Sequence, residues 1–269
     1  SEHLNSVFFI NNKFGWIAGE NGTVLHTTNS GAKWLKQTFS TLNNLYSIFF
    51  VDENIGWCAG STIHQTMDGG NNWVYQYTPF AANSIYFIDE DHGWAACNDG
   101  RILKTANGKD WTIKTTGTNY DFFSVHFINT DIGWVSGIFS TYIPGYGAFH
   151  SRRILKTIDG GEAWIQLYSS AYYSYLGIGD IFVVDQNIGW ACNPGLPLLK
   201  TTDGGSNWIE LGYDGGSSIH FIDYNTGWIV GNDQGKIYQS TDGGESWVNQ
   251  PSSVNSMLNS VYFINDSTG

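Results

Sequence analysis

The chain has 269 residues, among them 33 Gly, 12 Trp, 15 Tyr and 16 Phe, while charged residues make up only 13%. Such a composition favours strands and turns over helices, and the length suits one large all-β domain or two small ones. The formal net charge of -12 argues against nucleic acid and anionic lipid as partners. Without an apolar run of spanning length, we expect no direct membrane insertion.

Three short elements recur along the chain in a fixed order. The first reads Ser-Val/Ile-x-Phe-Ile/Val-Asp/Asn and begins at Ser6, Ser47, Ser84, Ser124, Asp180, Ser218 and Ser260. A Gly-Trp pair follows, with its tryptophans at Trp16, Trp57, Trp94, Trp134, Trp190 and Trp228. The third element, Thr/Ser-x-Asp-Gly-Gly-x-x-Trp, ends at Trp34, Trp73, Trp111, Trp164, Trp208 and Trp247. The two sets together contain all 12 tryptophans, so the chain is built from internal repeats.

Each repeat spans about 40 residues and holds four short β-type runs separated by turn residues, which is typical of a propeller blade. The sequence therefore predicts an all-β protein, a β-propeller of four-stranded antiparallel blades. We expect six complete repeats plus the first strand of a seventh. They form one domain over residues 1–269, with repeats starting near 6, 47, 84, 124, 180 and 218 and a partial repeat from 260.

The last residue, Gly269, stands where every other repeat continues with Trp. We expect a C-terminally truncated chain, a fragment of a propeller with at least seven blades. A ring closed by six blades, with the last strand left over, is the alternative.

The third element has the chemistry of a tight turn. An Asp carboxylate accepts hydrogen bonds from nearby backbone amides, and Gly adopts the positive φ that such a turn requires. The intact copies are centred on Asp68, Asp159, Asp203 and Asp242. We predict a structural role for these residues, because the alternating acidic ligands of a calcium loop are missing.

The fourth repeat carries a long insertion between its second and third predicted strands, and a long loop follows that repeat. Both segments belong to the variable loop face of the propeller, and loops on a rigid scaffold often carry function. Tyrosine offers a large contact area with a polar tip. We predict a ligand-binding cluster of Phe139, Tyr142, Tyr146, Phe149, Tyr168, Tyr172, Tyr173 and Tyr175. The alternative is a long loop that packs on its own blade.

The combined Phe-Ile-Asp, Gly-Trp and Thr-x-Asp-Gly-Gly-x-x-Trp pattern resembles the photosystem II stability/assembly factor-like propellers. That group lies within the Asp-box (BNR) repeat proteins, which include sialidases and xyloglucan-cleaving glycosidases. The resemblance covers the whole chain and implies a propeller fold. It also implies non-enzymatic binding of other proteins and a secreted, periplasmic or cell-surface location in bacteria.

No catalytic residues, cofactor or metal site emerge from the sequence. A sialidase clamps its substrate with three arginines from separate blades, whereas the only arginines here are Arg101, Arg152 and Arg153. A glycosidase that uses two carboxylates is harder to dismiss. Its candidates on the variable face are Asp99, Asp121, Glu210, Asp214 and Asp233.

We therefore expect an exported, non-catalytic propeller that acts as a protein-binding or assembly scaffold through its variable loop face. Its partner would be a protein or a polysaccharide. The alternative is a carbohydrate-binding or glycoside-hydrolase-type Asp-box propeller. A third possibility is a structural repeat unit within a longer surface protein.

Overall fold

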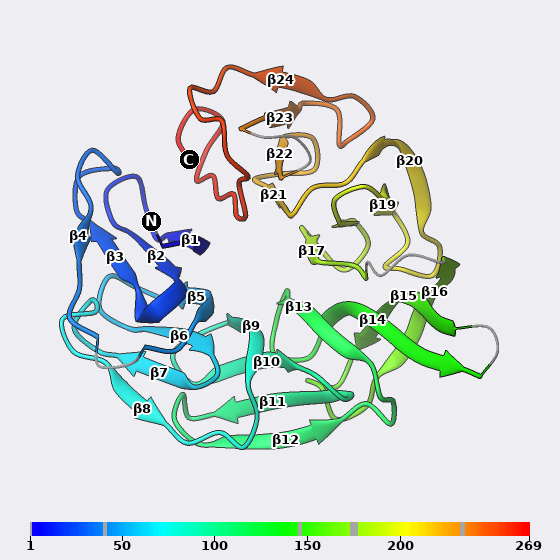
Figure 1. The fold of residues 1–269 in the computed structure, drawn as a ribbon, viewed down its shortest axis with the longest axis horizontal. Coiled ribbons are helices and arrows are strands. Elements are labelled where there is room, and N and C mark those ends of the chain that lie inside the picture. Colours follow the sequence, from blue (N-terminus) through cyan, green and yellow to red (C-terminus); the bar gives the residue numbers. More distant parts are fainter. Residues whose placement is uncertain (1, 40–41, 145–146, 173–176, 232–234) are drawn as a thin grey trace.

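A computed structural model describes residues 2–39, 42–144, 147–172, 177–231 and 235–269. It confirms an all-β propeller of six four-stranded antiparallel sheets, arranged as blades around a central axis (Figure 1). The first strand of each blade lies nearest the axis and the fourth lies at the rim. Besides the strands, these residues contain one short 3-10 turn, Glu20–Gly22.

The blades follow the predicted repeats. Blades one to three comprise β1 Leu4–Phe9, β2 Gly15–Gly19, β3 Val24–Thr27 and β4 Leu35–Lys36; β5 Leu45–Phe50, β6 Gly56–Gly60, β7 Ile63–Thr66 and β8 Val74–Gln76; and β9 Ala82–Phe87, β10 His92–Cys97, β11 Arg101–Ala106 and β12 Trp111–Thr115. Blades four to six comprise β13 Asp121–Phe127, β14 Gly133–Ile143, β15 Gly147–Thr157 and β16 Ile165–Tyr172; β17 Asp180–Val183, β18 Gly189–Cys192, β19 Pro197–Thr201 and β20 Ile209–Asp214; and β21 Ser218–Phe221, β22 Gly227–Val230, β23 Ile237–Ser240 and β24 Val248–Gln250.

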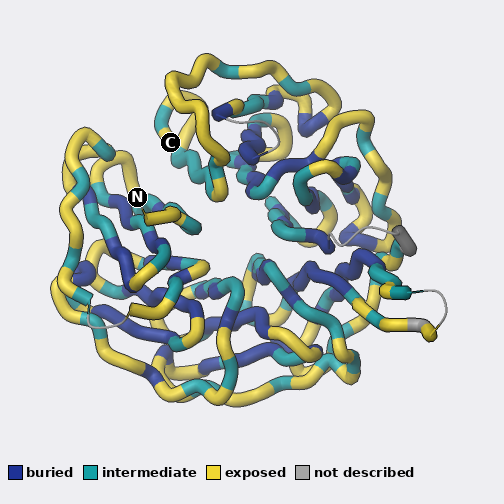
Figure 2. The backbone as a smooth tube through the Cα atoms, viewed as in Figure 1, coloured by how far each residue is buried: buried dark blue, intermediate teal, exposed yellow. Residues whose placement is uncertain are grey.

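The core lies between blades rather than inside them. Buried side chains form five apolar clusters, one at each interface between consecutive blades from the first to the sixth. In Figure 2 these buried residues follow the inner strands, whereas the outer strands are mostly exposed. Because one blade cannot cover its own two faces, stacking around the axis is what removes this apolar surface from water.

The Gly-Trp element connects each blade to the next. Trp16 of blade one stacks on Phe50 of blade two with ring centroids 3.6 Å apart, and its indole N–H donates to the Gly69 carbonyl at 2.9 Å. The glycine before the tryptophan is required by space: a Cβ at Gly56 would meet the Phe50 ring at 2.4 Å. The pair therefore has a steric and a hydrogen-bonding reason to recur.

The Asp-Gly-Gly turns have the geometry that their chemistry predicts. In the second blade the Thr66 hydroxyl donates to Asp68 Oδ1 at 2.9 Å and accepts the Gly70 amide at 2.8 Å. The same carboxylate oxygen accepts the Asn72 amide at 2.8 Å. The same arrangement of hydroxyl, carboxylate and amides surrounds Asp159, Asp203 and Asp242. These hydrogen bonds hold the hairpin between the third and fourth strands.

The first strand of a seventh repeat is not confirmed. Residues 260–264 are not assigned to a strand, because no second strand pairs with them in the described part of the chain. The segment nevertheless lies between the first and sixth blades. The Val7 amide donates to Ser260 Oγ at 3.2 Å, and the Val261 amide donates to Ser218 Oγ at 3.3 Å.

Across the described residues, no helix has the length and apolar character needed to cross a membrane.

Candidate functional site

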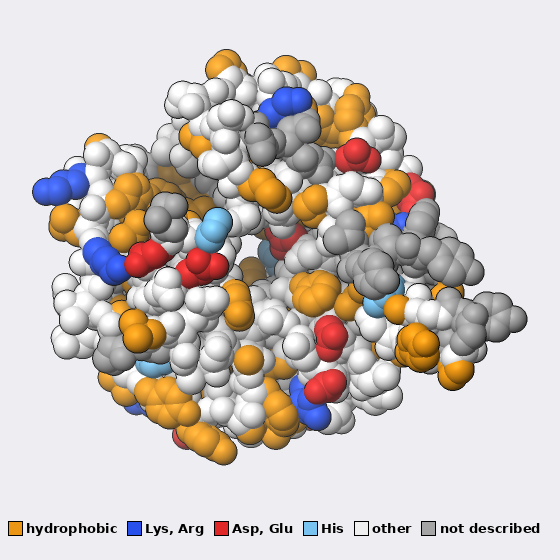
Figure 3. All heavy atoms as spheres, viewed as in Figure 1, with side chains coloured by type: hydrophobic (Ala, Val, Ile, Leu, Met, Phe, Trp, Pro, Cys, Tyr) orange, Lys and Arg blue, Asp and Glu red, His pale blue; other side chains and the backbone are white. Residues whose placement is uncertain are grey.

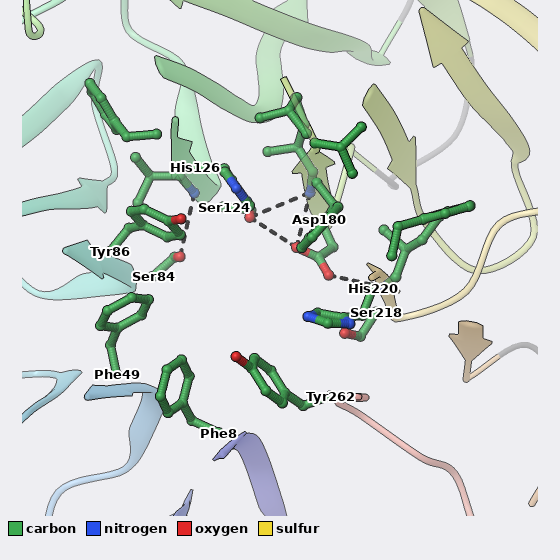
Figure 4. A pocket seen from close by; sticks show the side chains of 18 of the residues that line it. Phe8, Phe49, Ser84, Tyr86, Ser124, His126, Asp180, Ser218, His220 and Tyr262 are labelled. Carbon is green, nitrogen blue, oxygen red and sulfur yellow. Dashed lines mark hydrogen bonds between the residues drawn. The ribbon is translucent and has the colours of Figure 1, made fainter. Parts of the chain in front are cut away.

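The central channel is lined by one side chain from each inner segment. These side chains occupy the variable position of the first sequence element, and together they form a closed ring of seven aromatic groups around the axis. Figure 4 labels Phe8, Phe49, Tyr86, His126, His220 and Tyr262 of this ring. Neighbouring centroids lie between 4.5 and 4.9 Å apart, in the order Phe8, Phe49, Tyr86, His126, Phe182, His220, Tyr262 and back to Phe8. They border a hollow of about 540 Å³.

A second ring, of hydrogen bonds, lies beside the aromatic one. Each repeat opens with a Ser whose hydroxyl oxygen accepts a backbone amide from the next repeat. The donor is the residue that follows the opening Ser of that next repeat, as where the Ile48 amide donates to Ser6 Oγ at 3.2 Å. The same bond recurs around the axis and closes from Ser260 to Val7. In the fifth repeat Asp180 replaces the serine, and its Oδ2 accepts the Ile219 amide at 3.0 Å.

Asp180 is the one acidic group in this ring. Its Oδ1 accepts the Ser124 hydroxyl at 3.0 Å and the Ile181 amide at 2.9 Å. Burial raises the pKa of Asp180 to about 6, even though these donors stabilise the ionised form. The carboxyl group can therefore change its protonation state near neutral pH.

The two histidines of the aromatic ring stay neutral at pH 7. Burial lowers the pKa of His126 to about 3, and the neighbouring His220 contributes to this shift. Burial also lowers the pKa of His220 to about 4. Both imidazoles behave as uncharged aromatic members of the ring, so the channel wall carries no positive charge from them.

The other distinctive feature is the long hairpin of blade four. Strands β14 and β15 each have 11 residues, and their pairing continues to Ile143 opposite Gly147. The hairpin projects beyond the edge of the ring at the right of Figure 2. Hydrophobic side chains are exposed along this projection in Figure 3. Tyr142 lies near its end, with 71% of its surface exposed.

Two buried arginines anchor the base of this hairpin. Arg152 is 1% exposed and its Nη2 pairs with Glu210 Oε1 of blade five at 2.7 Å. Arg153 is also buried, and its guanidinium lies 5.1 Å from the Tyr120 ring and 5.4 Å from the Phe139 ring. The hairpin is therefore connected to the neighbouring blade and to the linker that precedes its own blade.

The predicted aromatic cluster divides into groups with different surroundings. Phe139 packs on Arg153, and Tyr168 lies 5.6 Å from the Arg152 guanidinium; both rings are half-buried, as is Phe149. Tyr142 is exposed. The structure pairs the Tyr172 backbone with His150, but the side chain of Tyr172 lies outside the description, and Tyr146, Tyr173 and Tyr175 lie outside the described residues.

The sequence analysis did not predict the channel. His126, His220 and Asp180 each occupy a position that recurs in every repeat. An alignment of the repeats contains the signal. The third position of the first element is aromatic in all seven copies, and Asp180 replaces the opening serine in the fifth. Only the closed ring shows that these positions face one another.

The acidic residues of the variable face that the structure describes have different surroundings. Asp99 binds Arg101 at 2.7 Å, and Glu210 binds Arg152. Asp121 accepts the Asp99 amide at 3.1 Å. Asp214 is exposed at the end of β20, and Asp233 lies outside the described residues. Within the described residues, no group of three or more His, Cys, Asp or Glu side chains could hold a metal ion.

Comparison with known proteins supports the fold. No protein-family model and no curated protein matches the sequence. Among solved structures, YCF48 from Cyanidioschyzon merolae is 20% identical with a TM-score of 0.71, covering 98% of this chain and 90% of its own. A structure of YCF48 bound to D1 peptide is 19% identical with a TM-score of 0.67, covering 92% and 82%. An ancestral GH74 enzyme is 15% identical with a TM-score of 0.65, covering 91% of this chain and 37% of its own.

Proposed function

We propose that this chain is a non-catalytic Asp-box propeller that acts as a protein-binding or assembly scaffold, with the β14–β15 hairpin on its variable loop face as the contact surface. The observation that carries the proposal is an exposed aromatic tip on an anchored base. Tyr142 is 71% exposed, whereas Arg152 and Arg153 below it are buried.

Anchoring matters because binding has an entropic cost. A surface that is already ordered loses less conformational freedom when a partner docks. The Arg152–Glu210 ion pair links β15 to β20 of the next blade, and Tyr120 donates to Gln166 Oε1 at 2.8 Å beside Arg153. An exposed Tyr adds contact area with few rotatable bonds. These features suit recognition of another protein.

The structural likeness to YCF48 bound to D1 peptide supports a peptide or protein as the partner. The sequence resemblance to photosystem II stability/assembly factor-like propellers points the same way. It also carries the proposal that the protein is exported to the periplasm, the cell surface or the medium, which fractionation of the source cells would test.

A photo-crosslinking amino acid at position 142 tests the contact surface. Tyr77 is the matched control, since it is 76% exposed and lies in the linker after β8 of blade two. In extract from the source cells, we expect position 142 to capture a discrete protein and position 77 to capture none of it. Equal capture at both positions, or none at either, would contradict this function.

A carbohydrate ligand is the second candidate, favoured by the likeness to a GH74 enzyme and by the tyrosines of the hairpin. A glycan array would compare the chain with a variant carrying Ala at Tyr142, Tyr146, Tyr172 and Tyr173. Sugar binding that disappears in the variant would favour this candidate over the protein scaffold. Product release from a bound polysaccharide would add hydrolysis.

A further inference from the structure

The central channel contains two adjoining hollows with different linings, and Figure 3 shows the surface hollowed at the axis. The larger hollow, of about 540 Å³, is bordered by the seven-membered aromatic ring and has the volume of a small-molecule site. The smaller, of about 160 Å³, is bordered by the serines that open the repeats and by Asn5, Asn83 and Asn259. Asp180 borders both, so it lies where the aromatic part of the channel meets the polar part.

The carboxylate of Asp180 has hydrogen-bond donors but no counter-charge. Its oxygens accept the Ser124 hydroxyl and the amides of Ile181 and Ile219, which fix its position. Within the described residues, no ion pair joins it to a Lys or Arg side chain, and the two histidines of the aromatic ring are neutral at pH 7. A charge held away from bulk water is costly unless an opposite charge accompanies it, so this part of the channel favours a bound cation.

The side chains on both sides of Asp180 offer hydrogen-bond acceptors. Asn5, Asn83 and Asn259 each use their side-chain amide to donate to a backbone carbonyl of the next repeat at 2.8 Å, so Oδ1 remains as the acceptor of each side chain. On the aromatic side, the hydroxyl groups of Tyr86 and Tyr262 point into the larger hollow (Figure 4). A phenol oxygen can accept as well as donate, whereas a primary ammonium group has three donors and no acceptor. Such a group therefore matches this set of atoms.

The aromatic ring suits an apolar body attached to that ammonium group. An apolar body that enters between these rings leaves water and gains contact with their large surfaces. The formal net charge of -12 also favours the approach of a cation over that of an anion. The two hollows thus match the two ends of one ligand.

We propose that the channel binds a small organic amine, with its protonated amino group beside Asp180 and its apolar body inside the aromatic ring. The ligand supplies the counter-charge that the chain itself does not place at this carboxylate. This site is separate from the β14–β15 hairpin and does not depend on the function proposed there. In the structural alternative, Asp180 is only a hydrogen-bond acceptor that links three consecutive repeats.

Phenethylamine and hexylamine, an aromatic and an aliphatic primary amine, are the probes. Phenethyl alcohol and hydrocinnamate are the controls, because they keep the apolar body of phenethylamine and carry a neutral or an anionic group instead. In an NMR titration of the whole chain at pH 8, we expect saturable binding of at least one amine. The alcohol and the carboxylate should each bind at least about tenfold more weakly.

Substitution of the carboxylate tests the location of the amino group. Asp180→Asn removes the charge at constant size and should weaken amine binding by about tenfold or more, with little effect on the alcohol. Asp180→Ser is a second variant, since Ser occupies this position in the other repeats. Asp110→Asn is the matched control: Asp110 is exposed at the rim and accepts a hydrogen bond from Asn107 that Asn can also accept. Circular dichroism of each unbound variant verifies folding.

The pH dependence of binding separates charge from shape. Burial raises the pKa of Asp180 to about 6, so about a tenth of these carboxyl groups are ionised at pH 5 and nearly all at pH 8. Amine affinity should therefore rise about tenfold from pH 5 to pH 8 in the natural chain and stay constant in Asp180→Asn. The other described groups with shifted pKa values around Asp180 keep their charge state over this range. Burial lowers the pKa of His126 and His220 and raises that of Tyr86, Tyr262 and Cys192.

Three results would overturn the proposal. The first is no saturable binding of either amine to the folded chain, and the second is equal binding of phenethylamine and phenethyl alcohol. The third is amine binding that neither Asp180→Asn nor a change from pH 8 to pH 5 weakens, since that would leave Asp180 with its structural role alone.

Discussion

Replacing Asp180 by Ser isolates the energetic effect of one carboxylate in the channel. Every other repeat has Ser at this position, so Asp180→Ser keeps an acceptor for the Ile219 amide. The difference between a pKa of about 6 in the folded protein and the ordinary value near 3.9 corresponds to about 3 kcal/mol. Loss of the Ser124–Asp180 hydrogen bond costs about 1 kcal/mol.

The sign of the pH dependence follows from the direction of the shift. The pKa of Asp180 is raised on folding, so the folded chain binds this proton more tightly than the unfolded chain does. Its contribution to stability is fully present below about pH 4 and is lost as the pH rises through about 6. We expect Asp180→Ser to be about 2 kcal/mol more stable than the natural chain at pH 8. At pH 4 we expect it to be about 1 kcal/mol less stable.

Guanidinium unfolding of both proteins at several values between pH 4 and pH 8 measures this difference. Comparison of the pair matters, because His126 and His220 have lowered pKa values in the folded protein, so their protonation in the unfolded chain also changes the stability of both proteins over this pH range. A difference in unfolding free energy that stays constant over this range would refute the reasoning. It would mean that Asp180 ionises in the folded protein as it does in water.

Three further substitutions probe other parts of the fold. Acidification from pH 7 to pH 4 should destabilise the His126→Phe variant by about 3 kcal/mol less than the natural chain. Folding lowers the pKa of His126 to about 3, so the stability that its neutral ring contributes is lost as the pH falls below the ordinary pKa of 6.5. Thermal melts at both pH values measure this difference. Glu210→Ala should lower the free energy of unfolding by about 2 kcal/mol in urea, because it leaves the buried Arg152 guanidinium without its ion-pair partner. An unchanged urea midpoint would contradict a stabilising role of this ion pair. Gly56→Ala should cost about 2 kcal/mol by overpacking, whereas Gly212→Ala, with no atom within 4 Å of the added Cβ, should change the melting temperature little.

The sequence predicted the blades because the residues that mark their strands and turns are close together along the chain. Trp57 follows Gly56 and Asp68 follows Thr66, so spacing alone reveals a strand, a hairpin and their order. The confirmed architecture is a sum of these local units, which is why the repeat count transferred directly to six sheets.

The channel could not be predicted in the same way. Tyr86 and His126 are far apart along the chain, and their 4.6 Å contact exists only because neighbouring blades place equivalent positions side by side. The length of the blade-four hairpin can be read from the sequence, but its anchoring cannot. The ion pair between Arg152 and Glu210 depends on how two blades face each other.

The five clusters between blades make the described part of the chain a stack of units, each coupled to its neighbours. Among the described residues, blades two to five each contribute to two of these clusters, whereas blades one and six each contribute to one. In a nearest-neighbour description, each cluster adds one coupling free energy to the two blades that share it. Local opening should therefore be easiest in blades one and six, and amide hydrogen exchange should be slowest in β10 and β14.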